Sequence, residues 1–326
     1  MSDTKLTNIF KTFFLFSVRL ILPHLPLKFL YLIGNFLGNI MIGQKVQVIK
    51  HDLRMLLGNL SEPNLDIIVR HTMQNFRKDL LEIWTFPKLN QARINRLSSF
   101  EGIEHLDNAL AKGKGAILCI THFGSWKIVL PALGYNGYKV SQIAANPLTF
   151  EKDEETSSHN KIMQIELECE SSLPVKFLYL DKGMSVRQIY KVLANNEIVV
   201  ISLDGIIGGK RMTLPFLNGS ILLSTGGASL SLSTEAPALP VFIVRQKNNK
   251  HKIIIHKPFV NINNGIDKET YVGDWMDRYV KLFEQYVRNH PDHYARYLYT
   301  IRKYPLPDHG HILKINNYEY SAGRKC

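Results

Sequence analysis

The sequence predicts an α/β protein with a mostly parallel central sheet flanked by helices. From about residue 99 onward, short apolar runs alternate with segments in which apolar residues recur at helical spacing. The apolar runs are continuous rather than broken by polar residues, which is typical of strands buried on both faces of a parallel sheet. Strands that alternate with helices require right-handed crossover connections. The chain of 326 residues is long enough to bury a substantial core in this way.

The individual elements follow from these patterns in chain order. Residues 46–86 show two segments of helical periodicity and predict two helices. The expected strands cover residues 115–121, 139–145, 175–180, 197–203, 238–245 and 252–257. The expected helices cover residues 103–112, 125–134, 156–169, 184–195, 224–234 and 268–289. No linker separates these elements, so we expect residues 61–326 to form a single compact unit.

The N-terminal stretch, residues 9–44, is rich in Phe, Leu and Ile, with basic residues interspersed. Its longest run without an ionisable residue, 29–44, is shorter than the roughly 20 residues that span a membrane, and no signal-peptide cleavage site follows. We expect residues 1–60 to form helices in the membrane interface; an ordinary helical cover over the core is the alternative. Residues 1–60 carry seven Lys and Arg against two Asp, which favours an anionic lipid surface.

The overall composition also favours anionic partners. The chain holds 40 Lys and Arg against 28 Asp and Glu, a net charge of +12. The basic residues are spread along the chain rather than gathered in a nucleic-acid-binding module, so we expect no nucleic acid partner. The three cysteines are scattered, and no His/Cys cluster has metal-ligand spacing. We therefore expect no disulfide framework, no metal and no cofactor.

The first candidate catalytic residue is His122. The buried strand expected over residues 115–121 runs directly into it, and a turn and then a helix follow. Open α/β sheets place their ligands at the carboxyl ends of their parallel strands. The strand expected over residues 197–203 ends in Asp204, which the same reasoning places at the same edge. The sequence thus predicts His122 and Asp204 as candidate catalytic residues.

Two further segments could bind an anion. Arg211 supplies a basic group beside an apolar segment, and a salt bridge to Asp204 is its structural alternative. Thr225, Gly226 and Gly227 precede a helix, where exposed amides could hold an oxyanion or a phosphate. Residues 227–231 do not have the spacing of a nucleophile elbow, and residues 205–210 do not have that of a phosphate-binding loop.

Several segments in a fixed order resemble those of the bacterial lipid A biosynthesis acyltransferase family. They are residues 101–106, 112–118, 121–126, 203–204, 214–219, 224–228 and 237–245, with further likeness at 25–27, 58–60 and 289–294. Each motif is weak alone, whereas their order over most of the chain is specific. The resemblance implies a membrane-associated, glycerolipid-acyltransferase-like fold that moves a fatty acyl chain from a thioester carrier to a lipid hydroxyl.

The family pattern is a histidine separated by four residues from an aspartate or glutamate. The resemblance implies that His122 is the general base, but Lys127 stands where the acid is expected. A lysine beside the imidazolium would repel it and lower the pKa of the histidine. Three interpretations remain open: Asp204 replaces the missing acid, Lys127 binds a phosphate or the carrier, or the chain has lost transfer activity.

The resemblance implies roles for the other candidates too. The amide of Gly124, or those of residues 226–227, would hold the developing oxyanion. Arg211 would engage a carrier or lipid phosphate. Trp126 and residues 215–217 would line an acyl pocket, with core packing as the alternative.

The sequence and the resemblance together predict a membrane-associated acyltransferase. The expected donor is an acyl-carrier-protein or coenzyme A thioester, and the expected acceptor is a hydroxyl or amine of a membrane lipid or glycolipid. The expected location is the cytoplasmic face of a bacterial inner membrane. The alternative, which Lys127 favours, is a catalytically impaired relative that binds lipid or carrier. An acidic stretch over residues 151–170 is either a solvated helix face or an acidic lip over a basic substrate group.

Overall fold

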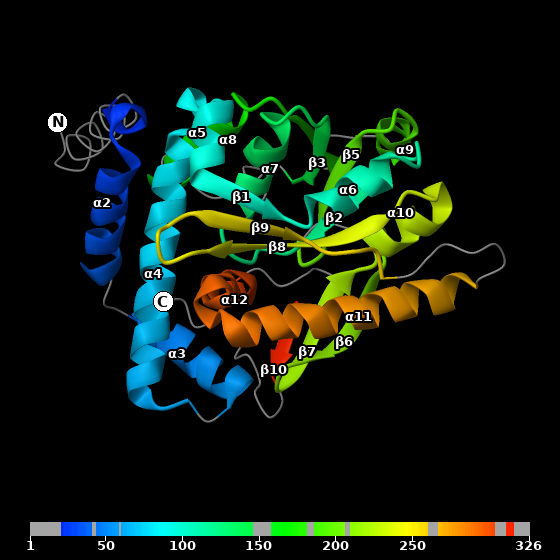
Figure 1. Cartoon of the computed structure of the whole chain (residues 1–326). Coiled ribbons are helices and arrows are strands. Elements are labelled where there is room, and N and C mark those ends of the chain that lie inside the picture. The colour runs from blue at the N-terminus through cyan, green and yellow to red at the C-terminus, as the bar shows by residue number, and fades with distance from the viewer. Residues whose placement is uncertain are drawn as a thin grey trace, which may run out of the picture.

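The computed structural model describes residues 21–40, 44–58, 60–145, 158–180, 186–205, 209–259, 267–303 and 311–315, which are built around a seven-stranded sheet. Its strand order is β1-β9-β8-β2-β5-β3-β4. The strands are β1 (Ser98–Glu101), β2 (Ala116–Ile120), β3 (Val140–Ala144), β4 (Lys176–Tyr179), β5 (Ile198–Ser202), β8 (Ala238–Arg245) and β9 (His251–Ile255). Strands β8 and β9 are antiparallel, and every other neighbouring pair is parallel. The predicted α/β class with a mostly parallel sheet is confirmed (Figure 1).

Strand β2 occupies the centre of this sheet, and both of its faces are buried. Ile117 and Cys119 pack into the larger of two core clusters, whereas Leu118 and Ile120 pack into the other. No residue of the strand faces water. The continuous apolar run in the sequence is therefore the direct consequence of a strand covered by helices on both sides.

Helices cover the two faces of the sheet in separate groups. The smaller cluster takes side chains from α5 (Gln91–Leu97), α6 (Ile103–Leu110) and α7 (Val129–Gly134). The larger cluster takes side chains from α9 (Val186–Ala194), α10 (Gly226–Thr234), α11 (Lys268–Asn289) and α12 (Ala295–Lys303). Helix α4 (Glu62–Trp84) runs past one end of the sheet and contributes to both clusters (Figure 1). Helix α8 (Ser158–Glu170) packs against α4.

A second, three-stranded antiparallel sheet was not expected from the sequence. It consists of β6 (Arg211–Phe216), β7 (Gly219–Ser224) and β10 (Leu313–Ile315) in the order β10-β7-β6. Strands β6 and β7 form a hairpin whose two-residue turn places Leu217 at a positive φ of 53°. Pro215 made residues 211–216 look unlike a strand, because a proline cannot donate a backbone hydrogen bond within a sheet. It is tolerated here because β6 lies at the edge of its sheet.

The N-terminal helices are present in the part of the chain that the structure describes. Helix α2 (Leu27–Ile40) packs along α4, and α3 (Gln44–Leu57) buries Ile49, Leu53 and Leu56 in the larger cluster. Residues 9–20 of the predicted interfacial stretch lie outside the described residues. None of the described helices combines the length and the apolar character needed to cross a bilayer.

A buried ion-pair network ties α4 to the sheet. Both oxygens of Glu82 accept hydrogen bonds from the Arg245 guanidinium at 2.8 Å, and His251 Nε2 lies 3.1 Å from both. Asp79, one turn earlier on α4, contacts the same guanidinium at 2.5 Å. Burial alone would raise the pKa of Glu82, but Arg245 and His251 outweigh it and hold this pKa well below the usual carboxyl range.

We predict that Glu82→Gln lowers the free energy of unfolding by about 3 kcal/mol, because it leaves a buried arginine without its full counter-charge. The matched change Glu62→Gln, at an exposed α4 carboxylate that pairs with Arg54, should cost less than about 0.5 kcal/mol. The loss of unfolding free energy in Glu82→Gln should be complete above the pKa of a glutamate in the unfolded chain, about 4.3. It should vanish as the pH falls through the lower pKa that Glu82 has in the folded protein. Urea denaturation at several pH values measures it; equal losses for the two variants would contradict the prediction.

Candidate active site

His122 and Asp204 meet at the carboxyl edge of the large sheet. They follow β2 and β5, which are neighbouring parallel strands with Ile120 paired to Ser202. His122 Nδ1 lies 2.8 Å from Asp204 Oδ1, and the backbone N–H of His122 donates to both carboxylate oxygens at 3.0 and 3.1 Å. The Asp204 side chain is fully buried, whereas that of His122 is 22% exposed. The carboxylate therefore favours the tautomer with a proton on Nδ1 and leaves Nε2 as an open acceptor.

Two tyrosines from the C-terminal part of the chain donate hydrogen bonds to Asp204 of this pair. The Tyr294 hydroxyl donates to Asp204 Oδ2 at 3.2 Å, and the Tyr297 hydroxyl donates to the Asp204 carbonyl at 2.7 Å. The Tyr297 ring also stacks on the His122 ring, with centroids 4.1 Å apart and planes 4° apart. Burial first, and the Asp204 charge second, raise the pKa of both phenols well above the ordinary value, so both remain donors. The sequence pointed only to the segment 289–294, within which Tyr294 lies.

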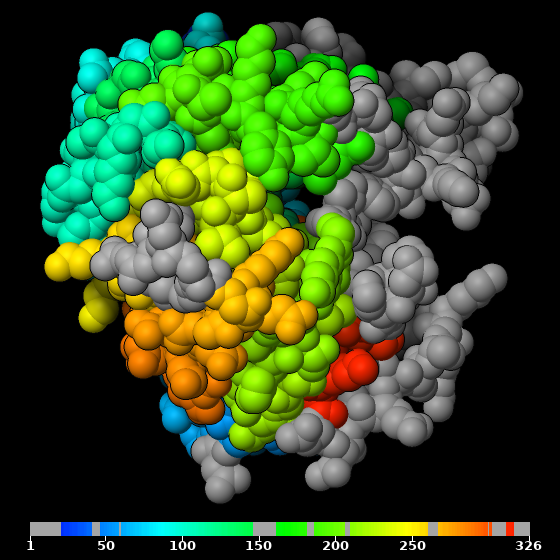
Figure 2. All heavy atoms as spheres, turned by 90° about the vertical axis from the view of Figure 1, so that its right-hand side faces the viewer, coloured from blue at the N-terminus to red at the C-terminus, as the bar shows by residue number. Residues whose placement is uncertain are grey.

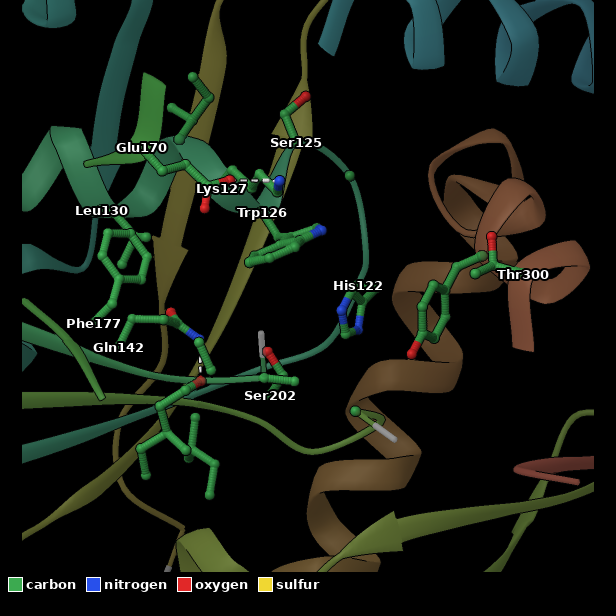
Figure 3. Close-up of a pocket in the computed structure, with 18 of the residues that line it drawn as sticks. His122, Ser125, Trp126, Lys127, Leu130, Gln142, Glu170, Phe177, Ser202 and Thr300 are labelled. Atoms are coloured by element: carbon green, nitrogen blue, oxygen red, sulfur yellow. Dashed lines mark hydrogen bonds and ion pairs between the residues drawn. The ribbon is translucent and has the colours of Figure 1, made fainter. Parts of the chain in front are cut away.

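A large cavity opens in front of His122. Its volume is about 790 Å³, and its lining surface, which is mostly apolar but includes charged side chains, comes from α4, α8, α9, α10 and α12 together with the strand ends. Figure 2 shows a hollow on the face where the green atoms of α9 and the yellow atoms of α10 lie. Figure 3 shows His122 on one side of this cavity and Leu130 and Phe177 on the other. A long apolar ligand could thus reach the open nitrogen of the imidazole.

Lys127 is held by two carboxylates of α8. Its Nζ lies 2.9 Å from Glu166 Oε2 and 2.5 Å from Glu170 Oε1. Burial alone would lower the pKa of the lysine, but these two carboxylates raise it above its ordinary value, so Lys127 stays charged. Trp126 lies between this ion-pair cluster and His122 in Figure 3. Part of the acidic stretch therefore neutralises Lys127, which makes no direct contact with the histidine.

Three of the amides that we expected to be able to hold an oxyanion, those of Gly124, Thr225 and Gly226, already donate within the chain. The Gly124 N–H donates to the His293 carbonyl at 2.9 Å, and the Gly226 N–H lies 3.2 Å from Ser224 Oγ. The Thr225 amide and hydroxyl both donate to the Lys210 carbonyl at 3.0 Å. A side chain at Gly227 would collide with Cys119 Sγ, which explains the glycine by packing.

Arg211 lies close to the pair but does not form the salt bridge that we considered. Its Nη2 donates to the Gly205 carbonyl at 2.5 Å, rather than to the Asp204 carboxylate. Burial lowers the pKa of its guanidinium below the ordinary value. Among the described residues, no group of three or more His, Cys, Asp or Glu side chains could hold a metal ion.

The fold and the site define a class: an α/β protein with a hydrogen-bonded His–Asp pair facing a large, mostly apolar cavity at the carboxyl edge of its sheet. The profile of the bacterial lipid A biosynthesis acyltransferase family matches residues 2–299, and the chain belongs to this family. The resemblance predicted from the motifs is thereby confirmed.

More specific relatives match over a shorter stretch. The phosphatidylinositol mannoside acyltransferases of two Mycobacterium tuberculosis strains, H37Rv and CDC 1551, are each 24% identical to this chain over 198 residues. The match covers 59% of this chain and 59% of each relative, so it spans about three fifths of their length.

We predict that Lys127→Glu lowers the free energy of unfolding by about 3 kcal/mol, because it places three carboxylates together in a partly buried cluster. The matched control is Lys139→Glu: Lys139 is exposed and lies 3.9 Å from a single carboxylate, that of Glu197. Its cost should stay below about 1 kcal/mol. Chemical denaturation of both variants checks this, and a Lys127→Glu variant as stable as the wild type would refute the ion-pair account.

Proposed function

We propose that this chain is an acyltransferase in which His122 is the general base and Asp204 orients it. The observation that carries the proposal is the 2.8 Å contact between His122 Nδ1 and Asp204 Oδ1, which leaves Nε2 open to the cavity. A buried carboxylate in this place fixes the imidazole ring and stabilises the imidazolium that forms when Nε2 accepts a proton. Of the three interpretations of Lys127, this geometry favours the one in which Asp204 replaces the missing acid.

In the proposed reaction, Nε2 of His122 accepts the proton of the acceptor hydroxyl while the acceptor oxygen attacks the thioester carbonyl carbon. The carbonyl π pair moves to its oxygen, and a tetrahedral intermediate forms. The C–S bond then breaks as the carbonyl re-forms. The departing sulfur takes the proton from the imidazolium, and His122 returns to its neutral state. An amine acceptor would follow the same course.

The cavity supports a fatty acyl substrate. Its mostly apolar lining and its volume of about 790 Å³ suit a flexible hydrocarbon ligand. The donor in this proposal is an acyl-carrier-protein or coenzyme A thioester, and the acceptor is a membrane lipid or glycolipid. Because the names of the mycobacterial relatives specify a phosphatidylinositol mannoside, a glycolipid is the first acceptor to test.

The alternative is a binding protein without transfer activity, and it depended on Lys127. The two ion pairs of Lys127 with Glu166 and Glu170 account for this residue without disturbing the His122–Asp204 contact. The exchange at position 127 is therefore compatible with proton transfer, and we favour the enzyme.

We predict that His122→Ala and Asp204→Asn each lower the rate of acyl transfer by about 10³-fold, because one removes the base and the other its orienting charge. The controls are His105→Ala and Asp274→Asn, since neither residue lines the cavity. Transfer of a labelled acyl chain from each thioester to a glycolipid extract measures the effect. Wild-type rates in His122→Ala would overturn the proposal, and lipid binding without turnover in the wild type would favour the alternative.

We also propose that α2 places the protein on the membrane. The large exposed apolar side chains of the described residues lie mostly on or just before this helix: Ile21, Phe29, Leu32, Phe36, Leu37 and Ile40. The remaining ones are Ile67 on α4 and the α9 pair Val186 and Tyr190. In Figure 1, α2 and α9 lie at opposite ends of the molecule. A row of this kind in one helix is costly in water and is typical of a helix that lies in the membrane interface.

We predict that Leu32→Asp lowers partition onto vesicles containing anionic phospholipid by about tenfold, because an apolar side chain no longer enters the lipid. Val186→Asp is the matched control, since Val186 is 59% exposed and Leu32 64% exposed, but the two lie at opposite ends of the molecule. Vesicle sedimentation measures both variants. Equal partition of Leu32→Asp and the wild type would remove α2 from the membrane contact.

A further inference from the structure

The indole N–H of Trp126 is open to the cavity. The chain has three tryptophans. The indole nitrogens of Trp84 and Trp275 are enclosed and have no hydrogen-bond partner, whereas that of Trp126 is not enclosed. Trp126 lines the cavity, and its N–H donates to none of the described residues. In Figure 3 the nitrogen end of this ring is on the side of His122, and the opposite end points toward Leu130 and Phe177.

This indole is also close to the base. The Trp126 and His122 rings meet edge to face, with centroids 4.9 Å apart and planes at 71°. The acceptor oxygen must lie about 3 Å from Nε2, and the carbonyl that it attacks lies about 3 Å further on. A donor on a ring that contacts the imidazole is therefore in reach of that carbonyl oxygen.

The residues on either side of Trp126 are anchored. The Ser125 hydroxyl donates to Asp79 Oδ1 at 2.5 Å and accepts from Arg245 at 3.1 Å. Lys127 is held by Glu166 and Glu170. Trp126 starts the short 3₁₀ helix η3 (Trp126–Ile128), so the backbone that carries the indole is fixed from both sides. A donor that is fixed before the reaction stabilises a developing charge without reorganisation.

We propose that the Trp126 N–H holds the thioester carbonyl oxygen and stabilises the oxyanion of the tetrahedral intermediate. This inference rests on the proposed acyl transfer. In the addition step the acceptor proton moves to His122 Nε2, the new C–O bond forms, and the carbonyl π pair moves to the oxygen that accepts the indole hydrogen bond. When the C–S bond breaks, that oxygen returns to a carbonyl and the sulfur takes the proton from Nε2. Trp126 neither gains nor loses a proton.

Two variants remove the indole N–H, and one of them keeps the bicyclic ring. At position 126, benzothienylalanine puts sulfur in place of the N–H, and Trp126→Phe removes the N–H with part of the ring. The same benzothienylalanine exchange at Trp84 is the matched control, because Trp84 does not line the cavity and its N–H has no partner. We expect both changes at 126 to lower kcat by about 10²-fold with KM within threefold, as for other single oxyanion donors. The control should keep the wild-type kcat.

The outcomes separate this inference from the proposed function. A wild type that transfers no acyl chain to any acceptor overturns both. An active wild type together with a benzothienylalanine-126 variant of unchanged kcat overturns the role of Trp126 alone. A variant in which only KM rises shows that the indole lines the acyl pocket without stabilising the oxyanion, and also overturns the inference.

A second measurement does not depend on turnover. A long-chain alkyl phosphonate presents a tetrahedral anion at the end of an acyl-like chain. In the ¹⁵N-labelled protein, we expect it to move the Trp126 indole N–H signal downfield and to leave those of Trp84 and Trp275 in place, with Trp126→Phe used for assignment. An unmoved Trp126 signal at saturating phosphonate would overturn the inference.

Discussion

The parallel pairing of β2 with β5 is the constraint on which the site depends. Ile120 and Ser202 are opposite each other in this pairing, and His122 and Asp204 each follow two residues later. Their contact joins residues 82 positions apart, and the Asp204 carboxylate also accepts the backbone N–H of His122. The Asp204 carboxylate therefore links the ends of β2 and β5 and also contacts the imidazole. A shift of one residue in this register would separate the two side chains, so the strand pairing and the proposed proton transfer depend on the same interaction.

The sequence could predict this pair because its physical cause is local. A continuous apolar run marks a buried strand, and a polar residue directly after it must lie at the sheet edge. Two such runs, before His122 and before Asp204, were enough to predict one edge for both, and the structure joins them at 2.8 Å. The same reasoning located β2, β3, β4, β5, β8 and β9 to within a few residues. The order of these strands in the sheet could not be predicted in this way, because it depends on contacts between segments that are far apart in the sequence.

Other parts of the site could not be predicted, because they depend on contacts between distant segments. Lys127 and Glu166 are 39 positions apart, so the sequence showed an unmatched lysine where the structure has an ion-pair cluster. Tyr297 comes from a helix that the sequence did not predict, and its stacking on His122 requires α12 to pack across the sheet edge. No acceptor for the Gly124 N–H can be recognised in the neighbouring sequence, yet this N–H donates to the carbonyl of the distant His293. The short strands β1 and β10 likewise form only through distant partners.

Position 127 departs from the family pattern, because a lysine stands where an acid is expected. The carboxylate that contacts the His122 ring comes instead from the end of the neighbouring strand β5, at Asp204. In the proposed function, Asp204 supplies the carboxylate for the imidazole, so position 127 can hold a lysine if the charge of that lysine is matched. Glu166 and Glu170 supply that match from successive turns of α8. The ion pairs hold the turn that carries Trp126 against α8, while Ser125 holds it against α4 through Asp79. In this structure Lys127 therefore anchors the turn that follows His122 through its two ion pairs.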